Sequence, residues 1–283
     1  MIKITTDSTA DLEHLFKTEN IPYIPLLVEL DGKNYRDGVD ISCEDIFKKY
    51  EEKKVLPKTA ANGTAEYVEF FNKVKGAGAE EIVHISISTE LSASYAGARA
   101  GAEEVGGVYV IDSKSLSSGV GLLVMKANDM AKAGGLSGKQ IAEKITALVP
   151  HVQASFVVDT MEFLHKGGRC SGLKAFIATV LKIKPMLILK EGKIIVGQKF
   201  MGNLSKNITK YVEAVIKQYD TPDYTRIFIT HTQCEPETVD AVREKIREIA
   251  PQFKEIIETR AGCTITSHCG KNTLGILYIN RPE

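Results

Sequence analysis

Apolar positions along the chain follow two patterns. Short runs rich in valine, isoleucine and leucine have the length and composition of buried strands, and most of the segments between them have helical patterns. The predicted strands span residues 2–5, 23–30, 82–88, 108–112, 154–159, 185–190, 194–200, 226–231, 255–259 and 275–280. The predicted helices span residues 42–54, 64–75, 92–104, 119–133, 137–148, 204–218 and 236–249. Strands that alternate with helices of this length are typical of crossover units around a mainly parallel sheet.

Turn residues add detail to this α/β pattern. Asp31-Gly32 between two strand-like segments predicts a tight hairpin, and Glu191-Gly192-Lys193 predicts a second one. The alternation of strands and helices restarts after Pro150. We therefore expect two packed α/β domains, residues 1–150 and residues 151–283, whose ligands gather at the carboxyl ends of strands.

The overall composition excludes several classes of protein. The chain has 283 residues, of which 43% are hydrophobic and 25% are charged, as in ordinary globular proteins. Its 36 basic residues balance 36 acidic ones, which argues against binding nucleic acid or anionic membrane by bulk charge and leaves only a local basic patch. The N-terminus lacks a signal-peptide pattern, and no apolar run reaches the ~20 residues that span a bilayer. We expect a cytoplasmic protein.

The cysteines also fit a cytoplasmic protein. The five cysteines are scattered and form no C-x-x-C pair. This spacing indicates neither a zinc site nor a disulfide framework, so reduced cysteines and no bound metal are expected.

Hydroxyl groups gather where the 82–88 strand gives way to the 92–104 helix. Ser92 lies where the loop enters that helix, and a helix N-terminus offers free amides and partial positive charge to an anion. Ser92 either caps the helix or adds a donor for a bound anion. The segment contains no G-x-S-x-G motif, so it gives little support to a nucleophilic serine of hydrolase type.

Two other polar segments have similar alternatives. After the first strand, Ser8 or Thr9 either caps a helix that begins near Ala10 or forms the polar rim of a cleft, with Asp7 orienting its neighbours. Residues 57–64 are predicted to be a loop in which Thr64 caps the next helix. Thr59 is not needed for that cap and is free to face the cleft.

Two segments in the second half carry candidate binding groups. His268 is predicted to lie in a glycine-flanked loop, where its imidazole can donate a hydrogen bond to an anion. The glycine spacing around it, from Gly262 to Gly270, does not match a phosphate-binding P-loop. Lys166 and Arg169 flank a Gly-Gly turn, either as a solvated charged surface or as a docking patch for an acidic partner.

Taken in order, these motifs resemble the DegV family of bacterial fatty acid-binding proteins. The matching segments are DSTADL near the start, P-K-T ending at Thr59, S-x-x-L-S-x-x-Y containing Ser92, V-x-D-S, L-x-K-G-G-R ending at Arg169, L-K-x-K-P ending at Pro185, and H-x-G starting at His268. The resemblance covers essentially the whole chain. Within it, three segments depart from the family pattern: Thr59-Ala60-Ala61-Asn62, which loses a hydroxyl and an amide, Ala93, and Lys271-Asn272, where Lys271 adds a cation near the expected head-group site.

The resemblance implies a fold and a function. The fold would be a two-domain DegV-type α/β fold, with a mainly parallel N-terminal sheet flanked by helices and a C-terminal mixed sheet. A long-chain fatty acid would lie in an internal tunnel, and the protein would present its carboxylate to a separate ATP-dependent fatty acid kinase subunit that makes acyl phosphate. This role would link the chain to phospholipid metabolism, with transient membrane contact but no anchor, and with no cofactor.

The resemblance also assigns residues to these roles. The fatty acid carboxylate would be bound by Thr59, Ser92 and His268. The supporting cleft residues would be Ser8, Thr9, Ala93 and Gly270. Lys166 and Arg169 would dock the kinase partner.

Two alternatives to a fatty acid carrier remain open. The first is a transferase or hydrolase that uses Ser92 and His268 as nucleophile and base, with Asp7 or Asp112 orienting the histidine. The second is a carrier for a non-lipid anion, which would have a short polar cleft instead of a long apolar tunnel.

Overall fold

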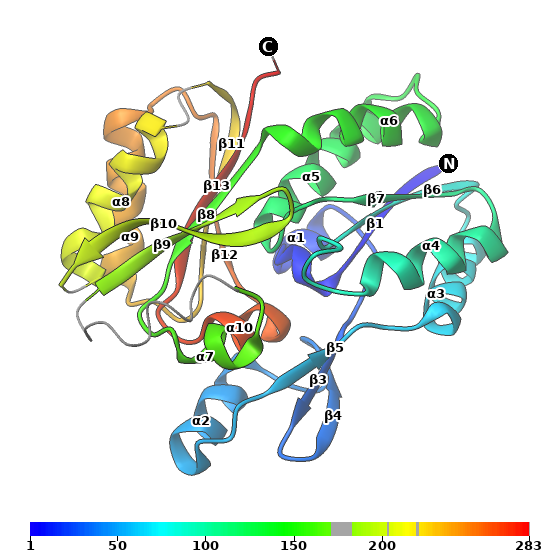
Figure 1. Ribbon diagram of the computed structural model, residues 1–283. Coiled ribbons are helices and arrows are strands. Elements are labelled where there is room, and N and C mark those ends of the chain that lie inside the picture. Colours follow the sequence, from blue (N-terminus) through cyan, green and yellow to red (C-terminus); the bar gives the residue numbers. More distant parts are fainter. Residues whose placement is uncertain (171–182, 203, 219–220, 283) are drawn as a thin grey trace.

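The computed structural model describes residues 1–170, 183–202, 204–218 and 221–282, whose strands form three sheets (Figure 1). The first sheet has the strand order β2-β1-β6-β7, and all of its neighbouring strands are parallel. Its strands are β1 (Ile2–Asp7), β2 (Tyr23–Ile24), β6 (Glu81–Ser86) and β7 (Val108–Asp112). The predicted parallel sheet in the first half is confirmed.

The second sheet is mixed and has the order β10-β9-β8-β13-β11-β12. Only β11 and β12 pair in parallel, and the other neighbouring strands are antiparallel. Its strands are β8 (Val152–Val157), β9 (Ile183–Lys190), β10 (Lys193–Met201), β11 (Pro222–His231), β12 (Glu255–Arg260) and β13 (Leu274–Asn280). A mixed second sheet is also what the family resemblance implies.

A third, antiparallel sheet has the order β4-β3-β5 and consists of β3 (Leu27–Leu30), β4 (Lys33–Arg36) and β5 (Lys58–Ala60). Both predicted hairpins are confirmed. The central residues of the first turn, Asp31 and Gly32, have φ of 54° and 78°, and those of the second, Glu191 and Gly192, have φ of 51° and 84°. Two consecutive positive φ values are what the tight turn of a two-residue hairpin requires.

The helices that the sequence pattern predicts are all present. They are α2 (Cys43–Lys53), α3 (Thr64–Gly76), α4 (Ser94–Val105), α5 (Ser118–Ala133), α6 (Gly138–Leu148), α8 (Leu204–Gln218) and α9 (Pro236–Ile249). The structure adds three short helices: α1 (His14–Thr18), α7 (Glu162–Gly167) and α10 (Cys263–Cys269). Within the described residues, no helix is long and apolar enough to cross a membrane.

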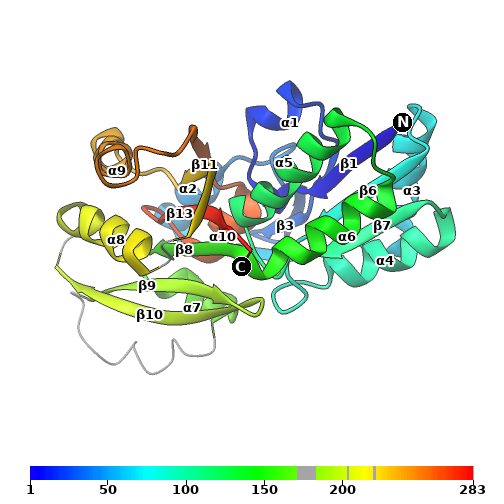
Figure 2. The same cartoon turned by 90° about the horizontal axis from the view of Figure 1, so that it is seen from above.

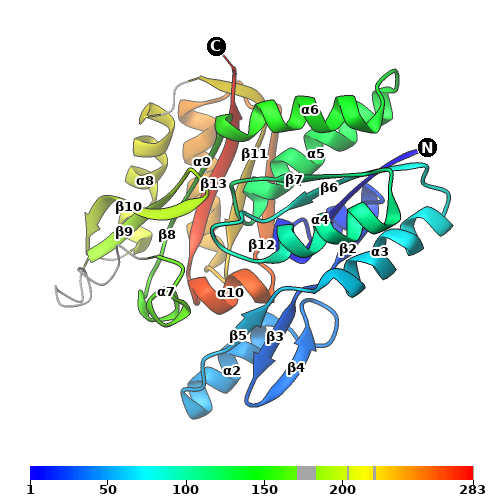
Figure 3. The same ribbon diagram turned by 45° about the vertical axis from the view of Figure 1, so that its right-hand side comes forward.

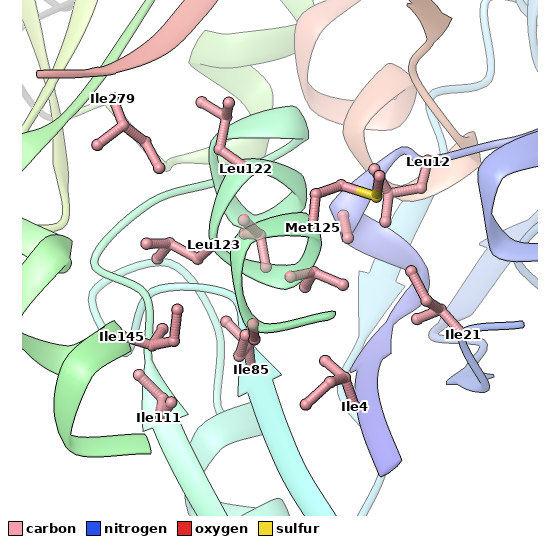
Figure 4. Packing of buried hydrophobic residues seen from close by; sticks show 14 of the residues in the cluster. Ile4, Leu12, Ile21, Ile85, Ile111, Leu122, Leu123, Met125, Ile145 and Ile279 are labelled. Carbon is pink, nitrogen blue, oxygen red and sulfur yellow. The ribbon is translucent and has the colours of Figure 1, made fainter. Parts of the chain in front are cut away.

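Helix α5 forms a layer shared by the first and second sheets. Its residues from Val120 to Met125 are nearly all inaccessible, because one side faces the first sheet and the other faces the second. Figure 4 shows Leu122 and Leu123 among Ile85 of β6 and Ile279 of β13. One continuous apolar core therefore joins the two halves of the chain.

The outer layers are amphipathic helices. Helices α3 and α4 cover the opposite face of the first sheet, where Tyr67 and Phe71 are fully buried. Helices α8 and α9 cover the outer face of the second sheet (Figure 2). This layering leaves the carboxyl ends of the first-sheet strands facing the segment that follows β12.

That segment contains α10, which packs against α2, α7 and the third sheet (Figure 3). The prediction that His268 lies in a glycine-flanked loop is therefore wrong, because His268 is part of α10. The local sequence Cys-Thr-Ile-Thr-Ser-His-Cys has weak helix propensity because three of its residues are β-branched. Carboxylates from the other end of the chain compensate: Asp11 accepts from the amide of Gly262, and Asp37 accepts from the amides of Cys263 and Thr264.

Two predicted caps and one predicted loop are also wrong. The helix expected near Ala10 is a 3-10 turn, Ser8–Ala10, and its N-cap is Asp7, which accepts from the amide of Thr9. Helix α3 is capped from Gly63, whose amide donates to Glu66, and not by Thr64. The predicted 57–64 loop contains β5, which is held by pairing with β3 although it has no apolar run of its own.

Candidate functional site

A cavity of about 190 Å³ lies at the carboxyl ends of β6 and β7, between the first sheet and α10. Residues that directly follow these strands line it, as do residues of β5, α7, β10 and α10. Its apolar walls are Leu26, Ile87, Leu91, Leu116, Leu164, Ile194 and Ile265. Its polar lining residues are Thr59, Ser92, Arg169, Thr264 and His268. The polar groups that the sequence pattern singled out in three distant segments thus share one cavity.

Thr59 and His268 form the polar pair of this cavity. Their side chains are joined by a hydrogen bond of 2.7 Å between Thr59 Oγ1 and His268 Nε2. Strand β5 places Thr59 opposite Val28 of β3, and α10 brings His268 from the far end of the chain. Two elements that the sequence did not predict therefore create the pair.

The histidine is neutral near pH 7. Burial, and then the positive charge of Arg169, lower the pKa of His268 to about 4. Its Nδ1 is buried and has no hydrogen-bond partner among the described residues. A buried N–H without a partner is rarer than a buried acceptor without one, so the tautomer protonated at Nε2 fits the site better. In that tautomer His268 donates to Thr59, and the hydroxyl proton of Thr59 is available to another acceptor.

Ser92 lies between β6 and α4, at the entrance of the helix. Its Oγ accepts from the amide of Ser94 at 3.2 Å and lies 2.9 Å from the Ser94 hydroxyl. The serine thus both satisfies a first-turn amide of α4 and lines the cavity. Ala93, the N-cap residue of α4, lines it too. The helix N-terminus and the hydroxyls together form an electropositive, donor-rich end.

Arg169 lies at the rim of the cavity. Its side chain is exposed, and its Nη1 donates to the carbonyl oxygen of Gly167 at 2.7 Å. Lys166 is exposed on α7 and is not part of the lining. Lys271 is exposed and does not line the cavity either, contrary to the expected cation near the head group. The start of the L-K-x-K-P motif, residues 181–182, lies outside the described residues.

Three of the expected cleft residues lie elsewhere. Ser8 and Thr9 are buried, and each hydroxyl donates its proton to a carboxylate: Ser8 donates to Asp37 at 2.8 Å, and Thr9 donates to Asp7. Gly270 packs against a ring of α7 and is not in the lining. These residues support the walls from behind instead of facing the cavity.

Ser92 and His268 have hydrogen-bond partners other than each other in the described part of the chain. Within the described part of the chain, no hydrogen bond joins Ser92 to His268, whose partner is Thr59. Asp7 is fully buried, which raises its pKa, and it accepts from the amides of Thr9 and Ile87. Asp112 accepts from Thr89 and the amide of Lys114. Neither aspartate reaches His268 by a hydrogen bond among the residues that the structure describes.

Over the described ranges, no group of three or more His, Cys, Asp or Glu side chains is arranged to hold a metal ion. No disulfide bond joins any of the five cysteines within the described part of the chain.

A second, smaller cavity of about 30 Å³ adjoins the first and shares Leu116, Ile265 and Cys269 with it. Its other walls include Phe156 of β8 and Leu277 of β13. The apolar lining therefore continues from the polar end toward the second sheet. No local motif marks these wall residues in the sequence, because an apolar residue that faces a cavity looks like any core residue.

The chain resembles known proteins over nearly its full length. A family model described as "Uncharacterised protein, DegV family" matches residues 1–281. The chain is 30% identical over 278 residues to a DegV domain-containing protein of Deinococcus radiodurans, covering 97% of each chain. A DegV family protein from Thermus thermophilus, described by its fatty acid binding, superposes with a TM-score of 0.88 at 28% identity over 99% of both chains. DegV of Bacillus subtilis, described as a fatty acid binding protein, superposes with a TM-score of 0.82 at 25% identity, also over 99% of both.

Proposed function

Because the chain belongs to the DegV family, we propose that it binds a long-chain fatty acid in the cavity at the ends of β6 and β7. The carboxylate would accept from Thr59, Ser92 and the electropositive start of α4, and the tail would lie among the apolar walls. The observation that carries the proposal is the Thr59–His268 pair at one end of a cavity whose walls are otherwise mostly apolar. The relatives described as fatty acid binding support it.

The energetics divide between the two ends of such a ligand. Each buried methylene contributes about 0.8 kcal/mol, so most of the affinity would come from the tail. Hydrogen bonds to a charged group contribute about 1.5–3 kcal/mol each, which sets the orientation of the carboxylate. A volume of about 190 Å³ is below the ~300 Å³ at which typical ligand sites begin. The adjoining cavity adds only about 30 Å³, so a long tail would also require side chains such as Leu116 and Ile265 to turn aside.

The proposed role is that of a carrier. A carboxylate held near the rim would be presented to a separate ATP-dependent kinase subunit for acyl-phosphate formation. Arg169 supports this role because it is both exposed and part of the cavity lining. Lys166 adds a second exposed cation on the preceding helix. The role requires no cofactor and no catalytic group from this chain.

The first experiment asks what the protein carries. Protein produced in a bacterial host is denatured, its lipids are extracted, and the extract is analysed by mass spectrometry. We expect one long-chain fatty acid per chain in the wild type and much less in His268→Ala. Recovery of no fatty acid, together with no binding of added palmitate, would contradict the proposal.

A second experiment separates the carrier from an enzyme. The isolated protein should not hydrolyse acyl esters or phosphoesters. Acyl phosphate should form only when ATP and a fatty acid kinase subunit are added. Ester turnover by the isolated protein that Ser92→Ala abolishes would favour the hydrolase alternative instead.

A further inference from the structure

Two adjacent glycines after Lys166 have different surroundings. Gly168 is the C-cap of α7 and has a φ of 69°, and a Cβ built on it meets no described atom within 4 Å. Gly167 ends α7 without a positive φ, but a Cβ built on it would lie 2.4 Å from His268 Nδ1. Gly168 is therefore needed for its backbone conformation, and Gly167 for the space that it leaves to the histidine ring.

A second glycine contact runs in the opposite direction between the same two helices. A Cβ on Gly270, the C-cap of α10, would lie 2.9 Å from the ring of Phe163 in α7. Each helix thus places a ring against a glycine of the other. This close approach fixes how far α10 lies from α7, and it brings His268 against the end of α7.

The imidazole of His268 is confined between Gly167 and Thr59. Its Nε2 edge has a hydrogen-bond partner in Thr59. Its Nδ1 edge has no partner among the described residues and faces Gly167, where a Cβ would lie 2.4 Å away. A methyl group at position 167 cannot coexist with the ring in this place. Because the ring also lines the cavity, the open direction for its displacement is into the proposed carboxylate site.

We infer that Gly167 is a positioning residue, which holds the imidazole of His268 where its Nε2 reaches Thr59 and so aims the Thr59 hydroxyl at the ligand. The effect on the ligand rests on the proposed fatty acid function. The effect on the ring does not, because it follows from the contact alone.

The test is a double-mutant cycle on palmitate affinity and urea unfolding. Gly167→Ala should weaken palmitate binding about ten-fold or more, the loss expected for one hydrogen bond to a charged group, and should lower stability. In a His268→Ala background the ring is gone and alanine is the better helix former, so Gly167→Ala should be neutral or slightly stabilising. Equal losses in both backgrounds would show a general packing role and overturn the inference.

Gly168→Asn is the matched control. Asparagine tolerates the left-handed conformation, and the space around position 168 is open. This variant should keep wild-type affinity although it changes the neighbouring residue of the same turn.

A readout without ligand separates this inference from the proposed function. The chain has six histidines, and the His268 imidazole signals in a ¹⁵N spectrum are assigned by their loss in His268→Ala. Gly167→Ala should shift these signals and Gly168→Asn should not, whether or not a fatty acid ever binds. Unchanged imidazole signals in Gly167→Ala would overturn the inference. If Gly167→Ala fails to fold, the Gly167→Ala/His268→Ala protein should fold, and its failure would overturn the inference as well.

Discussion

Replacing His268 by glutamine should remove a pH-dependent loss of stability from the folded protein. Glutamine keeps a donor near the position of Nε2 for Thr59, but it does not titrate. The pKa of His268 is lowered to about 4 from an ordinary value of 6.5, first by burial and then by Arg169. The unfolded chain therefore binds this proton more tightly than the folded protein does.

The sign and size of the effect follow from that difference. A folded-state pKa below the unfolded value means that the stability is complete above about pH 6.5 and falls as the pH drops toward 4. Each pKa unit corresponds to about 1.4 kcal/mol, so the wild type should lose about 3 kcal/mol relative to His268→Gln across this window.

Urea unfolding of both proteins at several pH values between 7.5 and 4 measures the difference. His84 is buried with its pKa lowered to about 3, but it is present in both proteins and cancels. A fatty acid carboxylate beside the ring would raise the pKa of His268, so saturating palmitate should flatten the difference between the two proteins. Parallel stability curves without ligand would refute the assignment of a neutral, partly buried imidazole.

Three further predictions concern the head group, the scaffold and the tail. Ser92→Ala should weaken palmitate binding about ten- to a hundred-fold but leave binding of the matching fatty alcohol nearly unchanged, as measured by calorimetry; an equal loss for both ligands would contradict a carboxylate contact. Asp37→Asn should cost about 2 kcal/mol in urea unfolding, because it sets an amide group against the N–H groups of Cys263 and Thr264; an unchanged unfolding midpoint would contradict this account. Leu116→Trp should fill the junction of the two cavities and shift the extracted fatty acids to shorter chains, while an unchanged chain-length profile would show that the tail takes another path.

Most of the helices and strands could be predicted from the sequence, because an element that buries one face repeats apolar residues at a regular spacing. The helices that lie on a sheet or against another helix repeat apolar residues at helical spacing, as α9 does with Val239, Val242 and Ile246. The two hairpins could be predicted from Asp31-Gly32 and Glu191-Gly192, because glycine in both turns and aspartate in the first suit positive φ. These signals are local, so a single sequence contains them.

The elements that were not predicted depend on distant partners. Helix α10 has little propensity of its own, and the carboxylates that accept from its first amides lie 251 and 226 residues away in sequence. Strand β5 has three residues and exists because it pairs with β3. These two elements carry His268 and Thr59, so their hydrogen bond could not be derived from any local pattern, although each residue could be named as a candidate.

The composition of the polar segment at the end of β1 suggests the rim of a cleft, but its carboxylates bind backbone amides from distant parts of the chain. Asp7 accepts from the amide of Ile87 at 3.2 Å, at the start of the loop that leads to Ser92. Asp11 accepts from the amide of Gly262 at 2.8 Å, at the start of the helix that carries His268. Burial raises the pKa of Asp7 and raises that of Asp11 well above its usual range. The ionised form of each carboxylate is therefore destabilised in its buried position. Their position is explained if they fix two backbone segments from different parts of the chain at one end of the first sheet. These two segments carry Ser92 and His268, so the carboxylates set the positions of the proposed ligand-binding side chains.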